Sequence, residues 1–282
     1  MSPLPAFVPA SAKWIVAVNT LLCVLFASTS EAEELRLAVA SNFTETARAL
    51  GAQFADAYAH QVRYSFASSA KLYTQIQHGA PFDILLSADQ AIPARLVASG
   101  LGVKETLLSY AQGQLVVWSP SAFARKKPPD SAAEILRRGT FNKLAIANPR
   151  LAPYGSAAMQ VLQKLGLEKS LNSKLVMGDN IAQTLQFVYS GNAELGMIAR
   201  AQLEQFAEDE RGDYWLVPQT LYAPLIHDAL VLRAASDKPA AHQFMQFLSS
   251  DEARRIIQKM GYQLIERKSE LRPDAEPRPI GT

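Results

Sequence analysis

Segments patterned like strands alternate with segments patterned like helices along nearly the whole chain, and this alternation constrains the fold more than any other feature. Residues 35–39 alternate apolar and polar side chains as a half-buried strand does. Residues 44–59 place apolar side chains at helical spacing, and 62–66 and 83–86 are short strand patterns. This order predicts an α/β fold with mostly parallel sheets flanked by helices.

A second series of the same kind follows a basic, proline-containing stretch at 125–129, which is typical of a surface loop. It alternates strand and helix patterns at 144–147, 156–165, 175–177, 181–190 and 195–199. A chain of 282 residues has room for two domains of roughly 100–150 residues. We expect two lobes: residues 33–117 with 223–266 in the first, and 118–222 in the second.

The first 32 residues are typical of a secretory signal peptide. Lys13 precedes an apolar run, 14–27, and Ser30-Glu31-Ala32 offers small residues three and one before a cut after Ala32. The run is short for a membrane-spanning helix, which needs roughly 20 apolar residues. We therefore expect cleavage, with an uncleaved N-terminal anchor as the alternative. At the other end, residues 267–282 are charged and rich in proline, which predicts a flexible tail.

Cysteine content and charge narrow the class of protein further. Cys23 is the only cysteine and lies inside the apolar run, so cleavage would leave a chain without thiols, which suits an oxidising compartment. Leu22 precedes it where a lipid-modified cysteine normally follows a small residue, so we expect no lipid anchor. The chain has 28 basic and 26 acidic residues, so it lacks the strong positive field that attracts nucleic acid.

The common enzyme motifs are missing from the sequence. It contains no Gly-x-Ser-x-Gly elbow, no His-Glu-x-x-His helix and no phosphate-binding Gly-x-x-x-x-Gly-Lys-Ser/Thr loop. The four histidines include no pair at metal-ligand spacing. His227 and Asp228 are neighbours on a predicted strand and would point to opposite faces, so a structural role is favoured over a catalytic one.

Polar residues recur where predicted strands end and helices begin. They are Ser41-Asn42, Ser68-Ser69, Pro153-Tyr154-Gly155-Ser156 and Gly178-Asp179-Asn180-Ile181. Each one alone is explained by helix capping, and Asn42 with Glu45 has the spacing of a capping box. Together they favour a ligand site, because ligands of open α/β sheets bind beyond the carboxyl ends of the strands. Several helix starts in one cleft would form an anion site without lysine or arginine.

These residues resemble the periplasmic molybdate-binding proteins of ABC importers, which have the two-lobed type II periplasmic binding-protein fold. The resemblance covers roughly residues 35–264. It is carried by Ala38-Val39-Ala40-Ser41-Asn42-Phe43, Phe66-Ala67-Ser68-Ser69, Gly79-Ala80-Pro81-Phe82-Asp83 continuing to Ser87-Ala88-Asp89-Gln90, Asn148-Pro149 with Pro153-Tyr154-Gly155, Leu195-Gly196-Met197-Ile198 and Lys259-Met260-Gly261-Tyr262. The block from Gly79 to Gln90 together with the two serines is the most specific part.

The resemblance implies a ligand set of hydroxyl and backbone N–H donors. Ser41 and Ser69 would be the serine ligands, and Asn42 would add a backbone or side-chain donor. Tyr154 and Ile181 would each present a backbone N–H. Many members of the family have a ligand tyrosine where this chain has Ala199, so Tyr154 or Asn42 would have to supply the missing donor.

The function implied is capture of molybdate, and of tungstate, in the periplasm and delivery of the anion to the membrane permease of an ABC importer. The protein would act as a monomer, without a cofactor and without a catalytic residue. Molybdenum would be bound only as the oxyanion. A donor-only site would reject a protonated anion such as hydrogen phosphate, because a buried donor would stay unpaired. The alternatives are the same fold with sulfate or a metal-chelate anion, a secreted hydrolase, and an effector-sensing module of a regulator.

Overall fold

The computed structural model describes residues 32–120 and 132–266, so the predicted signal peptide, the loop at 125–129 and the C-terminal tail lie outside the described residues. Contacts divide the chain into a short N-terminal unit, Met1–Glu33, and a main unit, Glu34–Thr282, which is described below. Among the described residues no helix combines the length and apolar character needed to cross a membrane.

The main unit contains two five-stranded sheets of the same mixed kind. The first has the order β2-β1-β3-β10-β4, in which β1 is parallel to β2 and β3, and β10 is antiparallel to β3 and β4. Its strands are β1 (Glu34–Ala40), β2 (Gln61–Ala67), β3 (Ile84–Leu86), β4 (Leu108–Gly113) and β10 (Leu225–Val231). Three parallel strands at one side thus carry the predicted βαβ pattern, and two antiparallel strands complete the sheet.

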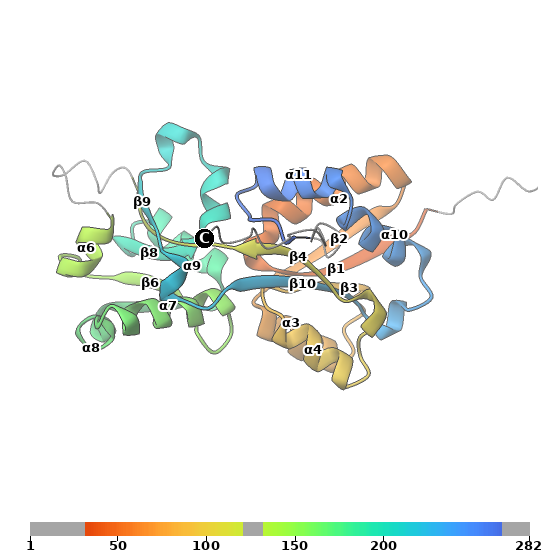
Figure 1. The fold of residues 1–282 in the computed structure, drawn as a ribbon, viewed down its shortest axis with the longest axis horizontal. Helices are drawn as coiled ribbons and strands as arrows, with labels where there is room; N and C mark the ends of the chain where they lie inside the picture. Colours follow the sequence, from red (N-terminus) through yellow and green to blue (C-terminus); the bar gives the residue numbers. More distant parts are fainter. Residues whose placement is uncertain (1–31, 121–131, 267–282) are drawn as a thin grey trace, which may run out of the picture. The chain divides into compact units, whose positions relative to one another are not determined.

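The second sheet has the order β7-β6-β8-β5-β9, with β6 parallel to β7 and β8, and β5 antiparallel to β8 and β9. Its strands are β5 (Leu115–Ser119), β6 (Leu144–Ala147), β7 (Leu175–Gly178), β8 (Leu195–Ala199) and β9 (Asp213–Leu216). Each sheet and its helices form one half of the main unit, called the first half and the second half below (Figure 1). The expected two-lobed α/β architecture is confirmed.

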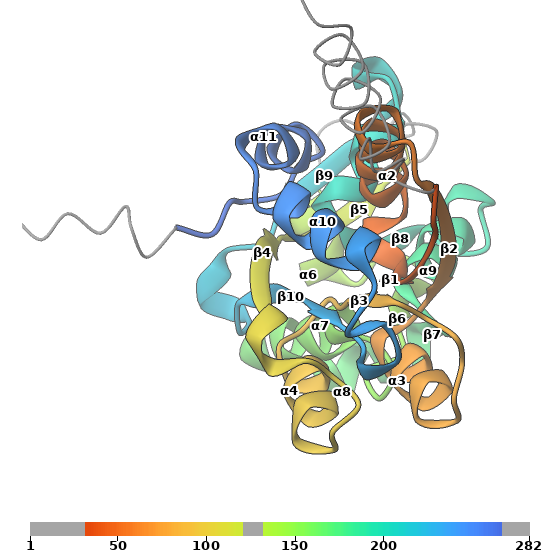
Figure 2. The ribbon, with the colours of Figure 1, turned by 90° about the vertical axis from the view of Figure 1, so that its right-hand side faces the viewer.

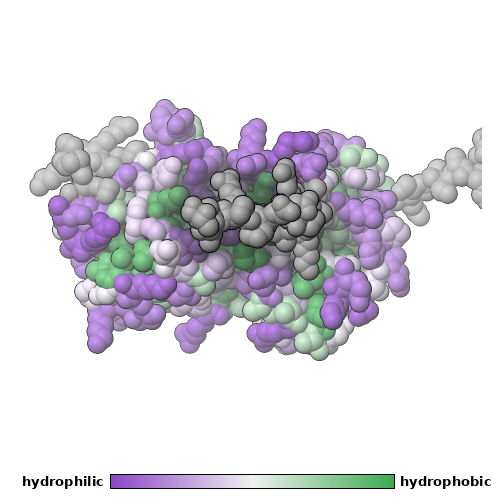
Figure 3. All heavy atoms as spheres, in the orientation of Figure 1, coloured by the Kyte–Doolittle hydropathy of each residue, from purple (hydrophilic) through white to green (hydrophobic). Residues whose placement is uncertain are grey.

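Helices cover both faces of each sheet, as the alternation of patterns predicts. They are α2 (Thr44–Tyr58), α3 (Ser69–Gln77), α4 (Ala91–Ala98), α6 (Ala132–Arg138), α7 (Pro153–Lys164), α8 (Glu168–Leu171), α9 (Ile181–Tyr189), α10 (Pro239–Leu248) and α11 (Asp251–Lys259). In the first half α2, α10 and α11 lie on one face and α3 and α4 on the other (Figure 2). Apolar side chains fill the space between sheets and helices, and hydrophilic residues cover much of the visible surface (Figure 3).

The chain crosses between the two sheets at neighbouring places. Gln114 alone separates β4 from β5, and the return path runs from β9 to β10 through residues 217–224. The expected lobe boundary after residue 117 falls inside β5, all of which pairs in the second sheet. The exact limits of the lobes stay a prediction. Gln114 is a better boundary than residue 117, because β4 before it pairs in the first sheet and β5 after it pairs in the second.

Several elements differ from the sequence patterns. The sequence also predicts a helix over residues 202–210, but the structure has two short 3₁₀ segments there, Arg200–Gln205 and Glu208–Glu210. Strand β4 and helix α6 carried no clear pattern, since β4 is buried unevenly and α6 has only seven residues. The predicted strand that contains Asp228 is β10, which begins at Leu225 because the chain enters it directly from the segment that crosses between the sheets.

Candidate functional site

A small buried cavity lies where the two halves meet, and the five predicted site residues all line it. Its volume is about 10 Å³, and it is lined by Ala40, Ser41, Asn42, Ser68, Ser69, Ala88, Ala152, Pro153, Tyr154 and Ile181. The first six come from the first half and the last four from the second. None of the five predicted residues is more than 6% exposed. A ligand held there would contact both halves at once.

Ser41 and Asn42 reach the cavity because β1 ends at Ala40 and the chain turns into a short 3₁₀ helix, Ser41–Phe43. Both residues lie at its start, where backbone N–H groups have no partner within the helix. The capping box predicted for Asn42 and Glu45 is wrong. Helix α2 begins at Thr44, after Phe43, and its N-cap residue makes no side-chain bond. The side chain of Asn42 instead donates to the hydroxyl of Tyr262.

Ser69 is the first residue of α3, directly after β2, so its backbone N–H also lies at a helix start. Its hydroxyl accepts a hydrogen bond from the N–H of Ala88 at 3.2 Å, which fixes the oxygen beside the cavity. Ser68 precedes it as the N-cap residue and makes no capping bond. The buried hydroxyl of Ser68 has no hydrogen-bond partner among the described residues, so it is a further donor available to a ligand.

Tyr154 is the second residue of α7, after Pro153. Proline at the first position of a helix has no N–H, so the N–H of Tyr154 is the first one this helix presents. The Tyr154 hydroxyl points elsewhere: a Cβ built on Gly113 would lie 2.0 Å from it and 3.0 Å from Nε2 of His227. Neither Gly113 nor His227 lines the cavity. Burial raises the pKa of Tyr154 well above its usual value. The structure thus favours the backbone of Tyr154 as the donor to a ligand.

Ile181 begins α9, and the preceding cap residue leaves its N–H free for a ligand. The side-chain oxygen of Asn180 accepts from the N–H groups of Ala182 and Gln183, both at 3.0 Å. The cap predicted at Asn180 is confirmed. It satisfies the second and third N–H groups of the helix, while that of Ile181 faces the cavity residues. Ala199 ends β8, and its N–H is taken by the side chain of Gln202.

The charge of the site comes from helix ends, because no charged side chain is among the described residues that line the cavity. Helices α3, α7 and α9 all begin there, and each helix start carries a partial positive charge. Asp89 lies behind Ser69, outside the lining. Burial raises the pKa of its carboxyl, although the N–H of Ile92 donates to it at 2.7 Å and the hydroxyl of Ser87 at 3.3 Å. The cavity therefore suits an anion that brings acceptors only.

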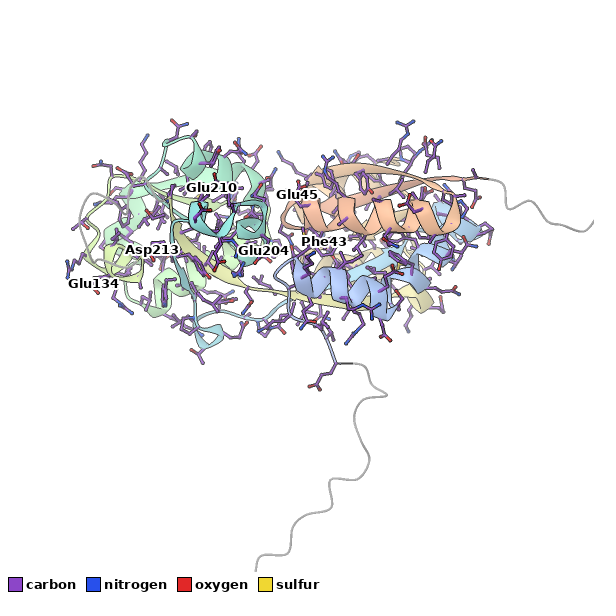
Figure 4. All side chains as sticks on the ribbon, turned by 90° about the horizontal axis from the view of Figure 1, so that it is seen from above. Phe43, Glu45, Glu134, Glu204, Glu210 and Asp213 are labelled. Atoms are coloured by element: carbon purple, nitrogen blue, oxygen red, sulfur yellow. The ribbon has the colours of Figure 1, made fainter. Side chains whose placement is uncertain are left out.

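A wider groove between the two halves borders the cavity. Ser41 and Asn42 line both, and the rest of the groove is mostly amide and hydroxyl side chains, among them Asn180, Gln183 and Gln202. Glu45 lines the groove from the edge of the first half that faces the second (Figure 4). Within the described part of the chain no cluster of three or more His, Cys, Asp or Glu residues could hold a metal ion.

Comparisons with known proteins agree with this arrangement. Residues 35–263 match the family of bacterial extracellular solute-binding proteins. The molybdate-binding protein ModA of Azotobacter vinelandii is 41% identical over 240 residues, 85% of this chain and 94% of that protein. ModA of Rhodobacter capsulatus is 42% identical, over 82% of this chain and 88% of that protein. The solved structure of the Azotobacter vinelandii periplasmic molybdate-binding protein superposes with a TM-score of 0.77 at 35% identity, covering 82% of this chain and all of that one.

The fold and the site at the junction of two halves define the class as a solute-binding protein. The chain belongs to the bacterial extracellular solute-binding protein family and, within it, to the ModA family.

Proposed function

We propose that this chain captures molybdate, and tungstate, in the periplasm and delivers the anion to the membrane permease of an ABC importer. The observation that carries the proposal is the convergence of three helix starts and three serine hydroxyls on one buried cavity without a charged lining. The relatives named as molybdate-binding proteins support the choice of anion. In ABC importers, such binding proteins deliver their ligand to the membrane permease.

The proposed ligand set consists of the hydroxyls of Ser41 and Ser69 and the backbone N–H groups of Asn42, Tyr154 and Ile181. The hydroxyl of Ser68 is an additional donor. All of these groups donate hydrogen bonds, and molybdate at neutral pH has four acceptor oxygens and no proton. Hydrogen phosphate carries a proton that needs an acceptor, and no carboxylate is among the described lining residues. Its rejection follows from the cost of an unsatisfied buried polar group.

Closure of the two halves over the anion is the second part of the proposal. Ser41, Asn42 and Ser69 belong to the first half, and Tyr154 and Ile181 to the second. An anion bonded to both halves stabilises their closed arrangement over any open one, because only the closed arrangement makes all the contacts. The permease would then recognise the closed, loaded protein.

The experiment that tests this ligand set compares two buried serines by calorimetric titration with sodium molybdate. Ser69→Ala removes a hydroxyl that lines the cavity and should weaken binding by about tenfold to a hundredfold, the value of a hydrogen bond to a charged group. Ser119→Ala removes a similarly buried hydroxyl at the end of β5, outside the cavity, which has no hydrogen-bond partner among the described residues. It should leave the affinity unchanged. Undiminished affinity in Ser69→Ala would refute the assignment of Ser69.

A further inference from the structure

Tyr262 and Asn42 hold each other through two hydrogen bonds behind the cavity, although 220 positions separate them. The side-chain nitrogen of Asn42 donates to the Tyr262 hydroxyl at 3.0 Å. The same hydroxyl donates to the backbone carbonyl of Asn42 at 2.7 Å. Both residues are buried, with 3% of Tyr262 and 6% of Asn42 exposed. One phenol thus restrains both the side chain and the peptide of Asn42.

The chain places Tyr262 there through the turn that follows α11. Gly261 has a φ of +83°, a left-handed conformation that favours glycine, and it reverses the chain after the helix. Gln263 then exchanges two backbone hydrogen bonds with Gln112 of β4, at 2.9 and 3.0 Å. Tyr262 is therefore fixed on both sides in sequence, by the turn and by the bridge.

Aromatic rings fix the orientation of the Tyr262 ring as well. It packs edge-to-face against Phe43 at a centroid distance of 5.1 Å and against His227 at 5.4 Å. Burial raises the pKa of Tyr262 well above its usual value, so the hydroxyl keeps the proton that it donates to Asn42. The hydroxyl therefore has one stable direction, toward Asn42.

The segment that carries Asn42 needs such support. It is a 3₁₀ helix of three residues whose N-cap makes no side-chain bond. So short a helix has too few internal hydrogen bonds to hold its own geometry. We infer that Tyr262 is a positioning residue for the anion site, which fixes the side chain and the carbonyl of Asn42 so that the N–H of Asn42 and the hydroxyl of Ser41 face the cavity. This inference rests on the proposed function of that cavity.

The test is Tyr262→Phe, which keeps the ring and removes both hydrogen bonds. The matched control is Tyr110→Phe in the same aromatic cluster. Tyr110 packs on Phe43 at 5.0 Å and on His227 at 5.9 Å, but its hydroxyl donates to the carbonyl of Ser87 instead of to Asn42. Each variant removes one buried hydroxyl, so a general loss of stability would be similar in the two.

Titration with sodium molybdate should show binding about tenfold weaker in Tyr262→Phe and within about twofold of wild type in Tyr110→Phe. In the ligand-free protein, the side-chain amide signal of Asn42 in a ¹⁵N–¹H spectrum should move and exchange faster only in Tyr262→Phe. Equal losses in the two variants, or unchanged affinity and an unchanged Asn42 signal in Tyr262→Phe beside a wild type that binds, would overturn this inference alone. A wild-type chain that binds no molybdate would instead overturn the proposed function.

Discussion

The ammonium group of Lys71 and the carboxylate of Asp179 are 2.6 Å apart, and they join the two halves beside the cavity. Lys71 lies in the first turn of α3, two residues after Ser69, and Asp179 lies two residues before Ile181. Nearby, the N–H of Ala70 donates to the carbonyl of Leu151 across the same junction at 3.2 Å. The two halves are thus held together by contacts directly next to the proposed ligands.

Loss of this ion pair should speed release of the anion. Both side chains are about half exposed, so the pair contributes no more than about 1 kcal/mol. Lys71→Met and Asp179→Asn should each raise the dissociation rate of molybdate by about twofold to fivefold in stopped-flow measurements. The two variants control for each other. If the charges acted only through their field on the anion, Asp179→Asn would bind more tightly, and that result would contradict the role given to the pair.

His227 should make the protein less stable in acid. It is fully buried, neither ring nitrogen has a hydrogen-bond partner among the described residues, and burial lowers its pKa to about 3. In the unfolded chain His227 takes up a proton as the pH falls through about 6.5, whereas in the folded chain it stays neutral until the pH approaches about 3. Stability is therefore unaffected above about pH 6.5 and lost as the pH falls toward 3.

The measurement is urea unfolding at pH 7 and pH 5. Wild type should lose roughly 2 kcal/mol more than His227→Leu between these two values, because each pH unit below 6.5 costs about 1.4 kcal/mol. Leucine has a similar volume and no titrating group. Equal pH dependence in the two proteins would show that His227 is protonated in the folded state.

Gly155 should tolerate no side chain. A Cβ at this position would lie 2.2 Å from the carbonyl oxygen of Ala147, at the end of β6. Gly155→Ala should push the start of α7 away from the sheet, lower the free energy of unfolding by about 2 kcal/mol or more, and weaken molybdate binding through Tyr154. Thermal unfolding and calorimetry would measure the two effects.

The control for this prediction is Gly191→Ala. Gly191 has a φ of +76° with open space around it, so alanine there costs only the strained backbone conformation, about 1 kcal/mol. It lies after α9, at the end far from Ile181, and should leave the affinity unchanged. A stable Gly155→Ala protein with normal affinity would show that α7 and β6 need not pack so closely.

The sequence patterns predict the two-lobed α/β architecture and the positions where strands give way to helices. The patterns also indicate the segments that contain Ser41, Ser69 and Ile181, because each lies where a clear strand ends or a helix begins, whereas the choice of these residues as ligands comes from the family resemblance. The contact between Asn42 and Tyr262 could not be predicted, since nothing in a linear pattern indicates a hydrogen bond across 220 positions. The direction of the Tyr154 hydroxyl was hidden for a similar reason. The direction of this hydroxyl depends on Gly113, the last residue of β4, and on His227 of β10, which both lie next to it.

Calorimetric titration of the unmodified protein, freed of bound anion by unfolding, dialysis and refolding, tests the central claim most directly. Molybdate, sulfate and phosphate would be added separately at pH 7. The account predicts saturable one-to-one binding of molybdate and no binding of phosphate, because the cavity is lined by donors without a carboxylate acceptor. Sulfate also brings four acceptor oxygens and no proton, but it is the smaller anion, so it should bind more weakly in a ring of donors fitted to molybdate. Absence of molybdate binding, or phosphate binding of equal strength, would contradict the account.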